Sequence, residues 1–331
     1  MTLDEFLEEW NNDSEKVLVH TSGSTGEPKP MWVEKRKMEA SARITCRFLG
    51  LQQGDTALLC MPLDYIAGKM VVVRSIVQGF RLVSVKPSGH PLRGLSAAPT
   101  FAAMVPMQVY NSLQDDGESE VLRQIRHLII GGGAIDDALA EALKDFPHSV
   151  WSTYGMTETL SHIALRRLNG SDASDWYTPF DSVRVGLTAE GCLTIDAPAV
   201  CDDVLVTNDI AQLSSDGSRF RILGRKDNVI DSGGIKIQAE EVERLLRPHL
   251  PVPFIVTSVP DPKFCEAVVL LHEPIQMSDD DIKEICIRVL PPYWPPRYYL
   301  EIPSLPLTET GKPARKRARD YAKCSLVHDG K

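Results

Sequence analysis

Short apolar segments alternate with helical patterns along the first half of this chain, and this alternation most constrains its fold. Apolar segments of strand length occur at residues 16–20, 56–60 and 127–130. Residues 33–49 lie between two of them and repeat apolar side chains at the spacing of one helix face. Such an order is typical of a parallel sheet that helices cover on both faces. The sequence therefore predicts an α/β fold.

The pattern changes near Gly224. Before it, residues 183–220 contain short apolar segments separated by glycine-containing turns, as in antiparallel strands. After it, we expect two helices, at residues 238–246 and 279–289, and two strands, at residues 254–259 and 267–271. Since 331 residues exceed the usual size of one domain, we expect a large N-terminal α/β domain over residues 1–223. A small, mobile C-terminal α+β domain is expected over residues 224–331.

Composition and charge exclude several classes of protein. The chain carries a formal net charge of −9, which disfavours binding to the nucleic-acid backbone. It has no apolar run of the roughly 18–20 residues that span a bilayer. The first ten residues include four acidic and no basic side chains, unlike a secretory signal. The seven cysteines form no Cys-x-x-Cys pair, so reduced thiols and a cytoplasmic location are expected.

The strongest chemical signal is the string TSGSTGEPK, which directly follows the first apolar segment. Glycines let backbone N–H groups approach phosphate oxygens, while hydroxyls donate hydrogen bonds and the lysine supplies positive charge. The string is not a Walker loop, because no Gly-Lys-Ser/Thr closes it. It predicts a polyphosphate site whose candidate ligands are Thr21, Ser22, Gly23, Ser24, Thr25, Gly26 and Lys29.

Four further motifs follow this string along the chain. They are residues 154–159 (YGMTET), residues 207–209 (TND), residues 224–227 (GRKD) with Gly233, and the segment from Pro306 through Lys312 to Arg315. Together, the five motifs resemble the adenylate-forming superfamily of acyl-CoA synthetases, aryl-CoA ligases, luciferases and peptide-synthetase adenylation domains, and they occur in that superfamily's order. They span nearly the whole chain, so the chain is similar to that fold in a truncated form.

The resemblance implies roles for residues of these motifs. Beyond the glycine-rich string, it implies that ATP is held by Gly132, Tyr154, Gly155, Thr157, Asp209 and Arg225. Glu158 is implied as a catalytic residue that helps to hold Mg²⁺, a hard cation that prefers oxygen ligands. Lys312 is implied as the catalytic lysine, which stabilises charge between the acid's carboxylate oxygen and the α-phosphate. Asp227 is implied as the hinge between the two domains.

Shorter matches imply the sites for the acid and for coenzyme A. The string MPLDYIAGK matches the stretch that lines the acyl pocket, which implicates Tyr65 and Lys69. Gly131 follows a strand, where an acyl group could lie against bare backbone, and Gly233 is implied in the CoA channel. A substrate with two carboxylates needs a second cation, for which Lys69 and Arg74 are candidates. Three alternatives stay open: core packing of Tyr65, a plain turn at Gly131, and surface positions for Lys69 and Arg74.

The chain departs from the family's pattern in three places. Only twenty residues precede the glycine-rich string, where family members usually carry a much longer segment, so the chain is either a compact member or an incomplete one. Its own Met1 and amphipathic first helix favour the former. Asn208 replaces the usual glycine before Asp209, and we expect it to fill a turn position with positive φ. Nineteen residues follow Lys312, too few for a fused carrier domain, so a separate acyl acceptor is expected.

The resemblance implies an ATP- and Mg²⁺-dependent, AMP-forming acid–CoA ligase that acts through an acyl-adenylate. The acyl-pocket string and residues 161–164 (SHIA) are similar to those of the o-succinylbenzoate–CoA ligases of menaquinone synthesis. Three alternatives stay open: another aryl- or acyl-acid CoA ligase, a stand-alone adenylation enzyme for a separate carrier protein, and a non-catalytic nucleotide-binding relative. The expected partners are a small carboxylic acid, ATP and CoA, without nucleic acid or a membrane span, and a homodimer stays open.

Overall fold

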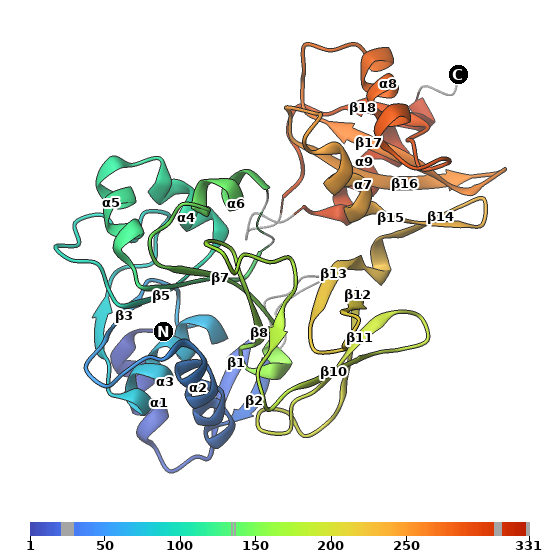
Figure 1. Ribbon diagram of the computed structural model, residues 1–331. Helices are drawn as coiled ribbons and strands as arrows, with labels where there is room; N and C mark the ends of the chain where they lie inside the picture. Colours follow the sequence, from blue (N-terminus) through green and yellow to red (C-terminus); the bar gives the residue numbers. More distant parts are fainter. Residues whose placement is uncertain (21–29, 134, 136, 308–312, 329–331) are drawn as a thin grey trace. The chain divides into compact units, whose positions relative to one another are not determined.

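The computed structural model describes residues 1–20, 30–133, 135, 137–307 and 313–328, and the chain divides into two compact units (Figure 1). Unit 1 comprises Met1–Gly186, Thr194–Leu205 and Leu213–Arg221. Unit 2 comprises Leu187–Leu193, Val206–Gln212 and Ile222–Lys331. None of the helices in the described ranges has both the length and the apolar character that crossing a bilayer requires.

Unit 1 is built on a seven-stranded sheet of order β4-β3-β5-β6-β7-β8-β9. Its strands are β3 (Thr56–Leu59), β4 (Arg81–Ser84), β5 (Phe101–Met104), β6 (His127–Ile130), β7 (Ser149–Gly155), β8 (His162–Arg167) and β9 (Thr178–Pro179). β3 to β7 pair in parallel, and β8 and β9 continue the sheet in antiparallel pairing. The carboxyl ends of the parallel strands therefore meet at one edge, which positions the candidate site.

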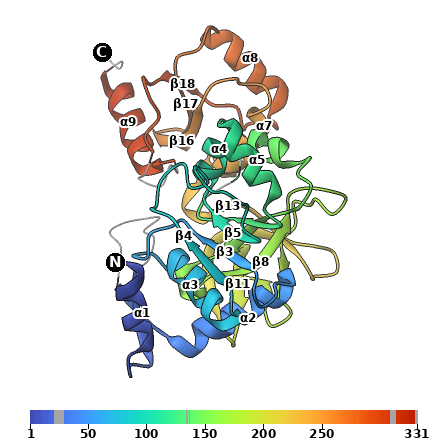
Figure 2. The same ribbon diagram turned by 90° about the vertical axis from the view of Figure 1, so that its left-hand side faces the viewer.

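Helices cover both faces of this sheet (Figures 1 and 2). One face carries α2 (Lys35–Leu49) and α3 (Ile66–Gln78), and the other carries α4 (Pro106–Leu113), α5 (Asp116–Gln124) and α6 (Asp137–Leu143). Fully buried apolar side chains of the sheet pack against those of the second helix layer and form one core, which includes Leu128 of β6, Val109 of α4 and Leu122 of α5. The α/β fold predicted from the alternating pattern is confirmed.

Helix α1 (Leu3–Asn11) is tied to unit 1 by both apolar and charged contacts. Phe6 is fully buried. One carboxylate oxygen of Glu9 accepts the backbone N–H of Leu18 at 3.2 Å, and the other lies 3.2 Å from the ammonium of Lys69. That ammonium also lies 4.9 Å from the centre of the Phe6 ring. Lys69, predicted as a contact of the acid, is therefore enclosed beneath α1 and neutralised by Glu9.

Three smaller sheets complete the chain. β1 (Lys16–His20) and β2 (Pro30–Glu34) form an antiparallel pair in unit 1. A four-stranded sheet of order β10-β11-β12-β13 carries residues of both units, and its strands are β10 (Arg184–Leu187), β11 (Cys192–Asp196), β12 (Leu205–Leu213) and β13 (Phe220–Arg225). Unit 2 holds β14 (Val229–Ser232), β15 (Ile235–Gln238), β16 (Phe254–Asp261), β17 (Cys265–His272) and β18 (Tyr298–Glu301).

The continuous part of unit 2 has the α+β organisation expected from the sequence. Its sheet has the order β15-β14-β17-β16, and β18 pairs in parallel with β17. The helices are α7 (Ala239–Leu246), α8 (Asp279–Val289) and α9 (Arg315–His328). Arg315 at the start of α9 donates two hydrogen bonds to Glu243 of α7, at 2.8 and 2.9 Å. The basic segment after Lys312 is therefore partly committed to ion pairs within this unit.

We expect the Lys69–Glu9 contact to stabilise the fold. Replacing Lys69 by Ala removes the partner of a partly buried carboxylate and the alkyl chain packed beside Phe6, so the free energy of unfolding should fall by about 2 kcal/mol. Urea denaturation of the two proteins measures the difference. Arg43→Ala is the matched control, because it breaks an exposed ion pair with Glu39 and should cost only about 0.5 kcal/mol. Equal losses in the two variants would contradict this interpretation.

Candidate functional site

Two bare-backbone positions lie side by side at the carboxyl edge of the parallel strands. Gly131 follows β6, and its N–H donates to the carbonyl of Met104 at the end of β5, at 3.0 Å. A Cβ atom on Gly131 would lie 2.4 Å from the hydroxyl of Thr153 in β7. Gly132 has a φ of +77°, a backbone conformation that favours glycine. The structure therefore requires glycine at both predicted positions: Gly131 because Thr153 packs against it, and Gly132 because of its positive φ.

The turn after β7 carries the predicted metal ligand. At Gly155, a Cβ atom would lie 2.3 Å from the carbonyl oxygen of Ser161, so only glycine fits between β7 and the segment leading into β8. Residues Thr157–Thr159 form a 3₁₀ turn in which Thr157 is buried and Glu158 is exposed. The Thr159 hydroxyl accepts the N–H of Met156 at 3.1 Å and lies 2.7 Å from the Ser161 carbonyl. Among the described residues, the exposed carboxylate of Glu158 has no hydrogen-bond or ion-pair partner, so it can bind a ligand.

Tyr154 belongs to a cluster of three aromatic rings in unit 1. Its ring meets that of Phe220 nearly edge-on, with centroids 5.1 Å apart and an interplanar angle of 78°. The Phe220 ring in turn stacks on Tyr177, with centroids 5.5 Å apart. Such packing fixes a ring at low entropic cost. Tyr154 is therefore held as a flat apolar face beside Gly155.

A buried polar cluster lies next to this turn. The side chain of Arg74 in α3 is only 1% exposed, and its Nη2 donates to the hydroxyl of Ser161 at 2.7 Å. Within the described residues, Arg74 has no carboxylate partner, and its Nε has no hydrogen-bond partner. Burial lowers the pKa of Arg74 to about 10. The alternative that Arg74 and Lys69 are surface residues is wrong, because each is 1% exposed.

His162 shares this cluster and stays neutral. Its Nδ1 lies 3.2 Å from the Ser161 hydroxyl and its Nε2 lies 3.1 Å from the hydroxyl of Thr45. Complete burial, and to a smaller extent the nearby charge of Arg74, lower the pKa of His162 well below its ordinary value. The sequence singled out residues 161–164 as a match to the family but not His162 as a hydrogen-bonding core residue.

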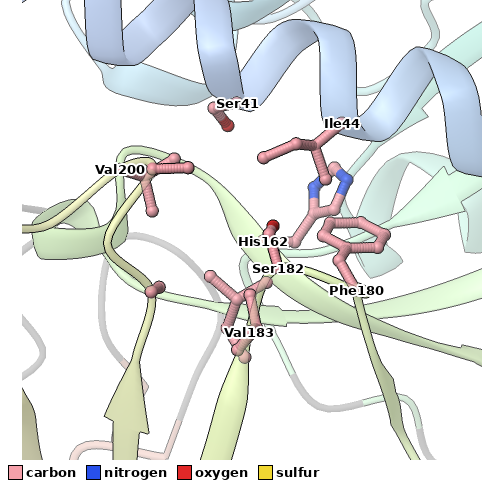
Figure 3. A pocket seen from close by; sticks show the side chains of 10 residues that line it. Ser41, Ile44, His162, Phe180, Ser182, Val183 and Val200 are labelled. Atoms are coloured by element: carbon pink, nitrogen blue, oxygen red, sulfur yellow. The ribbon is translucent and has the colours of Figure 1, made fainter.

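A small cavity adjoins His162 (Figure 3). Ser41 and Ile44 of α2 point into it from one side, and the His162 ring lies edge-on to Phe180 with centroids 5.6 Å apart. Its volume is about 10 Å³, which is close to the minimum for a single water molecule. In this form, the cavity does not hold an organic acid.

The glycine-rich string Thr21–Lys29 lies outside the described residues. The two residues that flank it, His20 and Pro30, pair across β1 and β2. His20 also forms a bridge with Tyr65, which brings this predicted acyl-pocket residue beside the base of the string. Tyr65 is 40% exposed, so the alternative of core packing is wrong.

In unit 2, three predicted residues form a charged cluster. Arg225 donates to Asp227 at 2.8 Å and lies 3.4 Å from the carboxylate of Asp209. Burial pushes the pKa of Arg225 down, but these two carboxylates, together with that of Glu240, outweigh this effect and raise the pKa above its usual range. Asn208 lies within β12 and is not among the described residues with positive φ. The expectation of a turn there is wrong, because the strand runs straight through the motif and needs no glycine.

The remaining predicted residues lie elsewhere in unit 2. Gly233 has a φ of +63°, and its N–H donates to the carbonyl of Phe264 at 2.7 Å. The guanidinium of Arg297 stacks on the Phe264 ring at 3.5 Å from its centre. Lys312 lies outside the described residues, but Leu307 and Pro313 on either side of that segment form a bridge. The candidate CoA-channel turn is therefore rigidly supported.

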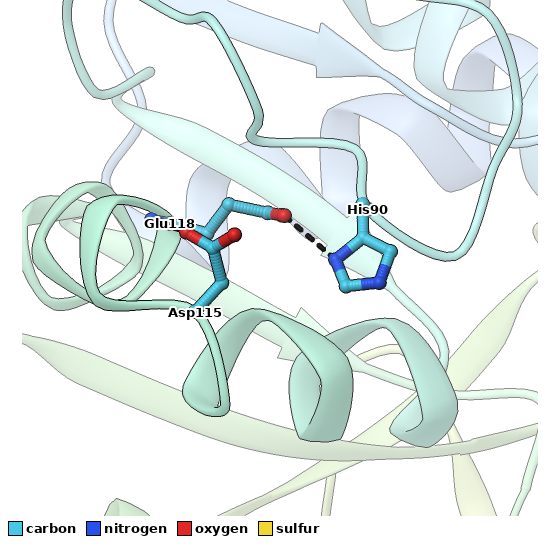
Figure 4. Close-up of side chains that lie close together, drawn as sticks. All are labelled: His90, Asp115 and Glu118. Atoms are coloured by element: carbon cyan, nitrogen blue, oxygen red, sulfur yellow. Dashed lines mark hydrogen bonds and ion pairs between the residues drawn. The ribbon is translucent and has the colours of Figure 1, made fainter.

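One cluster of metal-ligand types occurs in the described part of the chain, away from the predicted motifs (Figure 4). His90 lies 2.7 Å from the buried carboxylate of Glu118, and Asp115 lies nearby. Arg93 supplies positive charge there, with an Nη2 atom 3.2 Å from Asp115. Glu118 also accepts the N–H of Leu92 at 3.2 Å. These contacts fasten the segment after β4 to the N-terminus of α5 and leave no unmet need for a metal ion.

Comparisons with known proteins point in the same direction as the motifs. Residues 5–191 match the family described as AMP-binding enzyme. A 2-succinylbenzoate–CoA ligase from Bacillus cereus is 26% identical, and the match covers 94% of this chain and 71% of that protein. An acyl-CoA synthetase (AMP-forming)/AMP-acid ligase II-like protein from Dyadobacter fermentans has a solved structure that is 33% identical. The TM-score is 0.65, over 96% of this chain and 92% of that one.

A further solved structure contains the expected nucleotide and metal. It is the O-succinylbenzoate coenzyme A synthetase (MenE) from Bacillus subtilis in complex with ATP and magnesium ion. It is 23% identical with a TM-score of 0.74, and the match covers 91% of this chain and 69% of that one. At this identity, the likeness shows a shared fold.

The neutral, buried His162 should make stability depend on pH. Below its ordinary pKa of about 6.5, the unfolded chain binds a proton on His162 and the folded chain does not. The free energy of unfolding should therefore fall as the pH drops below about 6.5, by up to about 1.4 kcal/mol per pH unit from this group. Urea denaturation between pH 7 and 5 should show a shallower fall for His162→Gln. The exposed His148→Gln is the control, and equal slopes for all three proteins would contradict the assignment.

Proposed function

Because this chain belongs to the AMP-binding enzyme family, we propose that it is an AMP-forming acid–CoA ligase that acts on 2-succinylbenzoate. The family match confirms the resemblance that the five motifs predicted. The observation that carries the proposed acid is the buried guanidinium of Arg74, which lacks a carboxylate partner within the described residues and lies beside the Glu158 turn. The curated ligases of that acid support the assignment.

The proposed first step joins the acid to AMP. The glycine-rich string binds the phosphates of ATP, Tyr154 packs against the adenine, and Asp209 accepts hydrogen bonds from the ribose hydroxyls. The exposed carboxylate of Glu158 fits a Mg²⁺ ion, which would neutralise charge on the phosphate oxygens. A carboxylate oxygen of the acid attacks the α-phosphorus, the bond to pyrophosphate breaks, and an acyl-adenylate results. Lys312 stabilises the charge that develops between the two reacting groups.

The proposed second step transfers the acyl group to CoA. The thiol sulfur attacks the carbonyl carbon of the acyl-adenylate, AMP leaves, and the thiol proton passes to solvent. Lys312 has no task in this step, so we propose that the C-terminal domain, from about residue 224 onwards, turns about Asp227. The turn containing Gly233 then lines the channel for CoA. Hinge motion of this kind is a common way for one site to perform two reactions.

The second carboxylate of 2-succinylbenzoate gives Arg74 its proposed task. An arginine that is withdrawn from water without a negative partner is costly, and a carboxylate ligand that pairs with it recovers much of that cost. The planar guanidinium can bind a carboxylate through two parallel hydrogen bonds. The Nη2 atom of Arg74 donates to Ser161, and the Nε atom has no partner among the described residues, so the guanidinium retains a donor for the acid's carboxylate.

The reaction itself is tested with purified protein, ATP, Mg²⁺ and a panel of carboxylic acids, with and without CoA. We expect pyrophosphate release with 2-succinylbenzoate, and AMP and the thioester when CoA is added. Lys312→Ala should lower the rate of pyrophosphate release by roughly a hundredfold or more, because a preorganised charge is lost. Turnover of a different acid would replace the substrate assignment and keep the ligase. Absence of AMP with every acid would overturn the proposed function.

Substitution of Arg74 tests the choice of acid. We expect Arg74→Gln to raise the KM for 2-succinylbenzoate by about 30-fold, because a charge-assisted hydrogen bond worth about 2 kcal/mol is lost. The KM for ATP should change little. Initial rates with 4-oxo-4-phenylbutanoate, which lacks the ring carboxylate, serve as the control for folding and should be similar in both proteins. Lys69→Ala, whose ammonium is enclosed by Glu9, should not change the KM for the acid selectively. An equal effect of Arg74→Gln on both acids would reject the assignment.

A further inference from the structure

A groove of about 470 Å³ lies at the amino ends of the parallel strands, opposite the edge that carries the candidate site. Its polar lining residues are Asp55, Arg81, Ser96, Thr100, Gln124 and Arg126. The strands between the two edges are four residues long, so the groove is separated from the candidate site by about 13 Å of sheet. Volumes of this size are typical of sites for small molecules.

The strand register places two arginines at opposite ends of this groove. Arg81 of β4 pairs in register with Thr56 of β3. The hydroxyl of Thr56 lies 3.3 Å from the hydroxyl of Thr100, which directly precedes β5. The Thr100 carbonyl accepts the N–H of His127 at 3.0 Å, so Arg126 comes next in the row. The order Arg–Thr–Thr–Arg therefore crosses four strands, and the backbones of the two arginines are about 14 Å apart.

The charges in the groove are unbalanced. Arg81 and Arg126 are exposed, and among the described residues neither has a carboxylate partner. Arg81 donates only to the carbonyl of Gly54, at 3.4 Å. The third charged lining residue, Asp55, is engaged in its own turn, where its carboxylate accepts the N–H of Gln52 at 2.7 Å.

Several other exposed arginines of unit 1 do have a carboxylate partner. Arg43, Arg93 and Arg184 are each paired with a carboxylate, at 3.1, 3.2 and 2.7 Å. The chain as a whole carries a net charge of −9, so carboxylates are abundant. A polar groove with two unpaired guanidinium groups is therefore a local positive region on an acidic protein.

We propose that this groove binds a small molecule with two anionic groups, one at each end, such as a bisphosphate or a dicarboxylate. Each guanidinium offers a planar pair of N–H donors that matches phosphate and carboxylate oxygens. The hydroxyl of Ser96, also in the lining, adds a neutral donor. The proposal does not depend on the proposed ligase activity, because none of these residues belongs to the nucleotide or acid site.

The experiment uses hexane-1,6-diyl bisphosphate as the probe and isothermal titration calorimetry as the measurement. Saturating ATP and Mg²⁺ are present throughout, so that the probe is excluded from the phosphates' own site. We expect one bisphosphate per chain, bound at least tenfold more tightly than hexyl monophosphate, because only the former engages both ends. Equal affinity of the two probes, or no binding of either, would overturn the proposal.

Matched variants locate the binding. Arg81→Gln and Arg126→Gln should each weaken bisphosphate binding by tenfold or more, and each should reduce the advantage over the monophosphate. Both residues are exposed, so the folded state should be retained, which thermal unfolding checks. Arg43→Gln removes another exposed arginine, which lies outside the groove, and should leave the affinity unchanged. Loss of affinity in Arg43→Gln to the same extent would show a general effect of charge and would overturn the groove assignment.

Discussion

Parallel, in-register pairing of β3, β5, β6 and β7 is the constraint on which the unit 1 part of the site depends. It brings the ends of β6 and β7 to one edge, so that Gly131 faces Thr153, and the antiparallel pairing of β7 with β8 then places Gly155 against Ser161. At both glycines, a single added carbon would lie within 2.4 Å of a neighbouring atom. The backbone at these two positions therefore leaves no room for a side chain. Glu158 lies in the turn that directly follows the second of them, Gly155.

The same pairing gives the sheet two candidate binding edges of different character. At the carboxyl edge, the candidate residues are two glycines, the ring of Tyr154 and one charged side chain, Glu158. At the amino edge, two arginines and two threonines form a row across the strands. A parallel sheet separates such edges by the length of its strands, because every strand begins at one edge and ends at the other. Ligands bound at the two edges, as proposed, would therefore not compete for space.

Sequence patterns predicted the elements and the motifs well, because both are local. The helix expected at residues 279–289 is α8 with the same bounds, and Gly131 lies at the end of the strand expected at residues 127–130. Patterns failed where a contact joins distant segments. Lys69 is paired with Glu9, 60 residues earlier, and nothing in the spacing of either residue indicates this. The exposure of Tyr65 and the burial of Arg74 likewise depend on which elements cover α3.

Asn208 shows a different kind of error. A glycine in a family motif was interpreted as a need for positive φ, but glycine is also used where a ligand approaches the backbone closely. In this chain, the motif lies inside β12, and Thr207 supports Asp209 by accepting its N–H at 3.1 Å. The backbone conformation of Asp209 is thus set by its place in the strand and by the hydrogen bond to the Thr207 hydroxyl. A motif residue can therefore change while the orientation of the functional side chain is kept.

The cluster around Arg74 connects two proposed roles that the sequence presented as separate: binding of the acid's second carboxylate and positioning of Glu158. Arg74 holds the hydroxyl of Ser161, the Ser161 carbonyl lies 2.7 Å from the hydroxyl of Thr159, and Thr159 braces the turn that presents Glu158. On the proposed function, the group that pairs with the far carboxylate of the acid is two hydrogen-bonded residues away from the Mg²⁺ ligand. Binding free energy from the unreactive end of a substrate is most useful when it orders the reacting centre. A short, buried chain of hydrogen bonds has the rigidity to transmit that ordering.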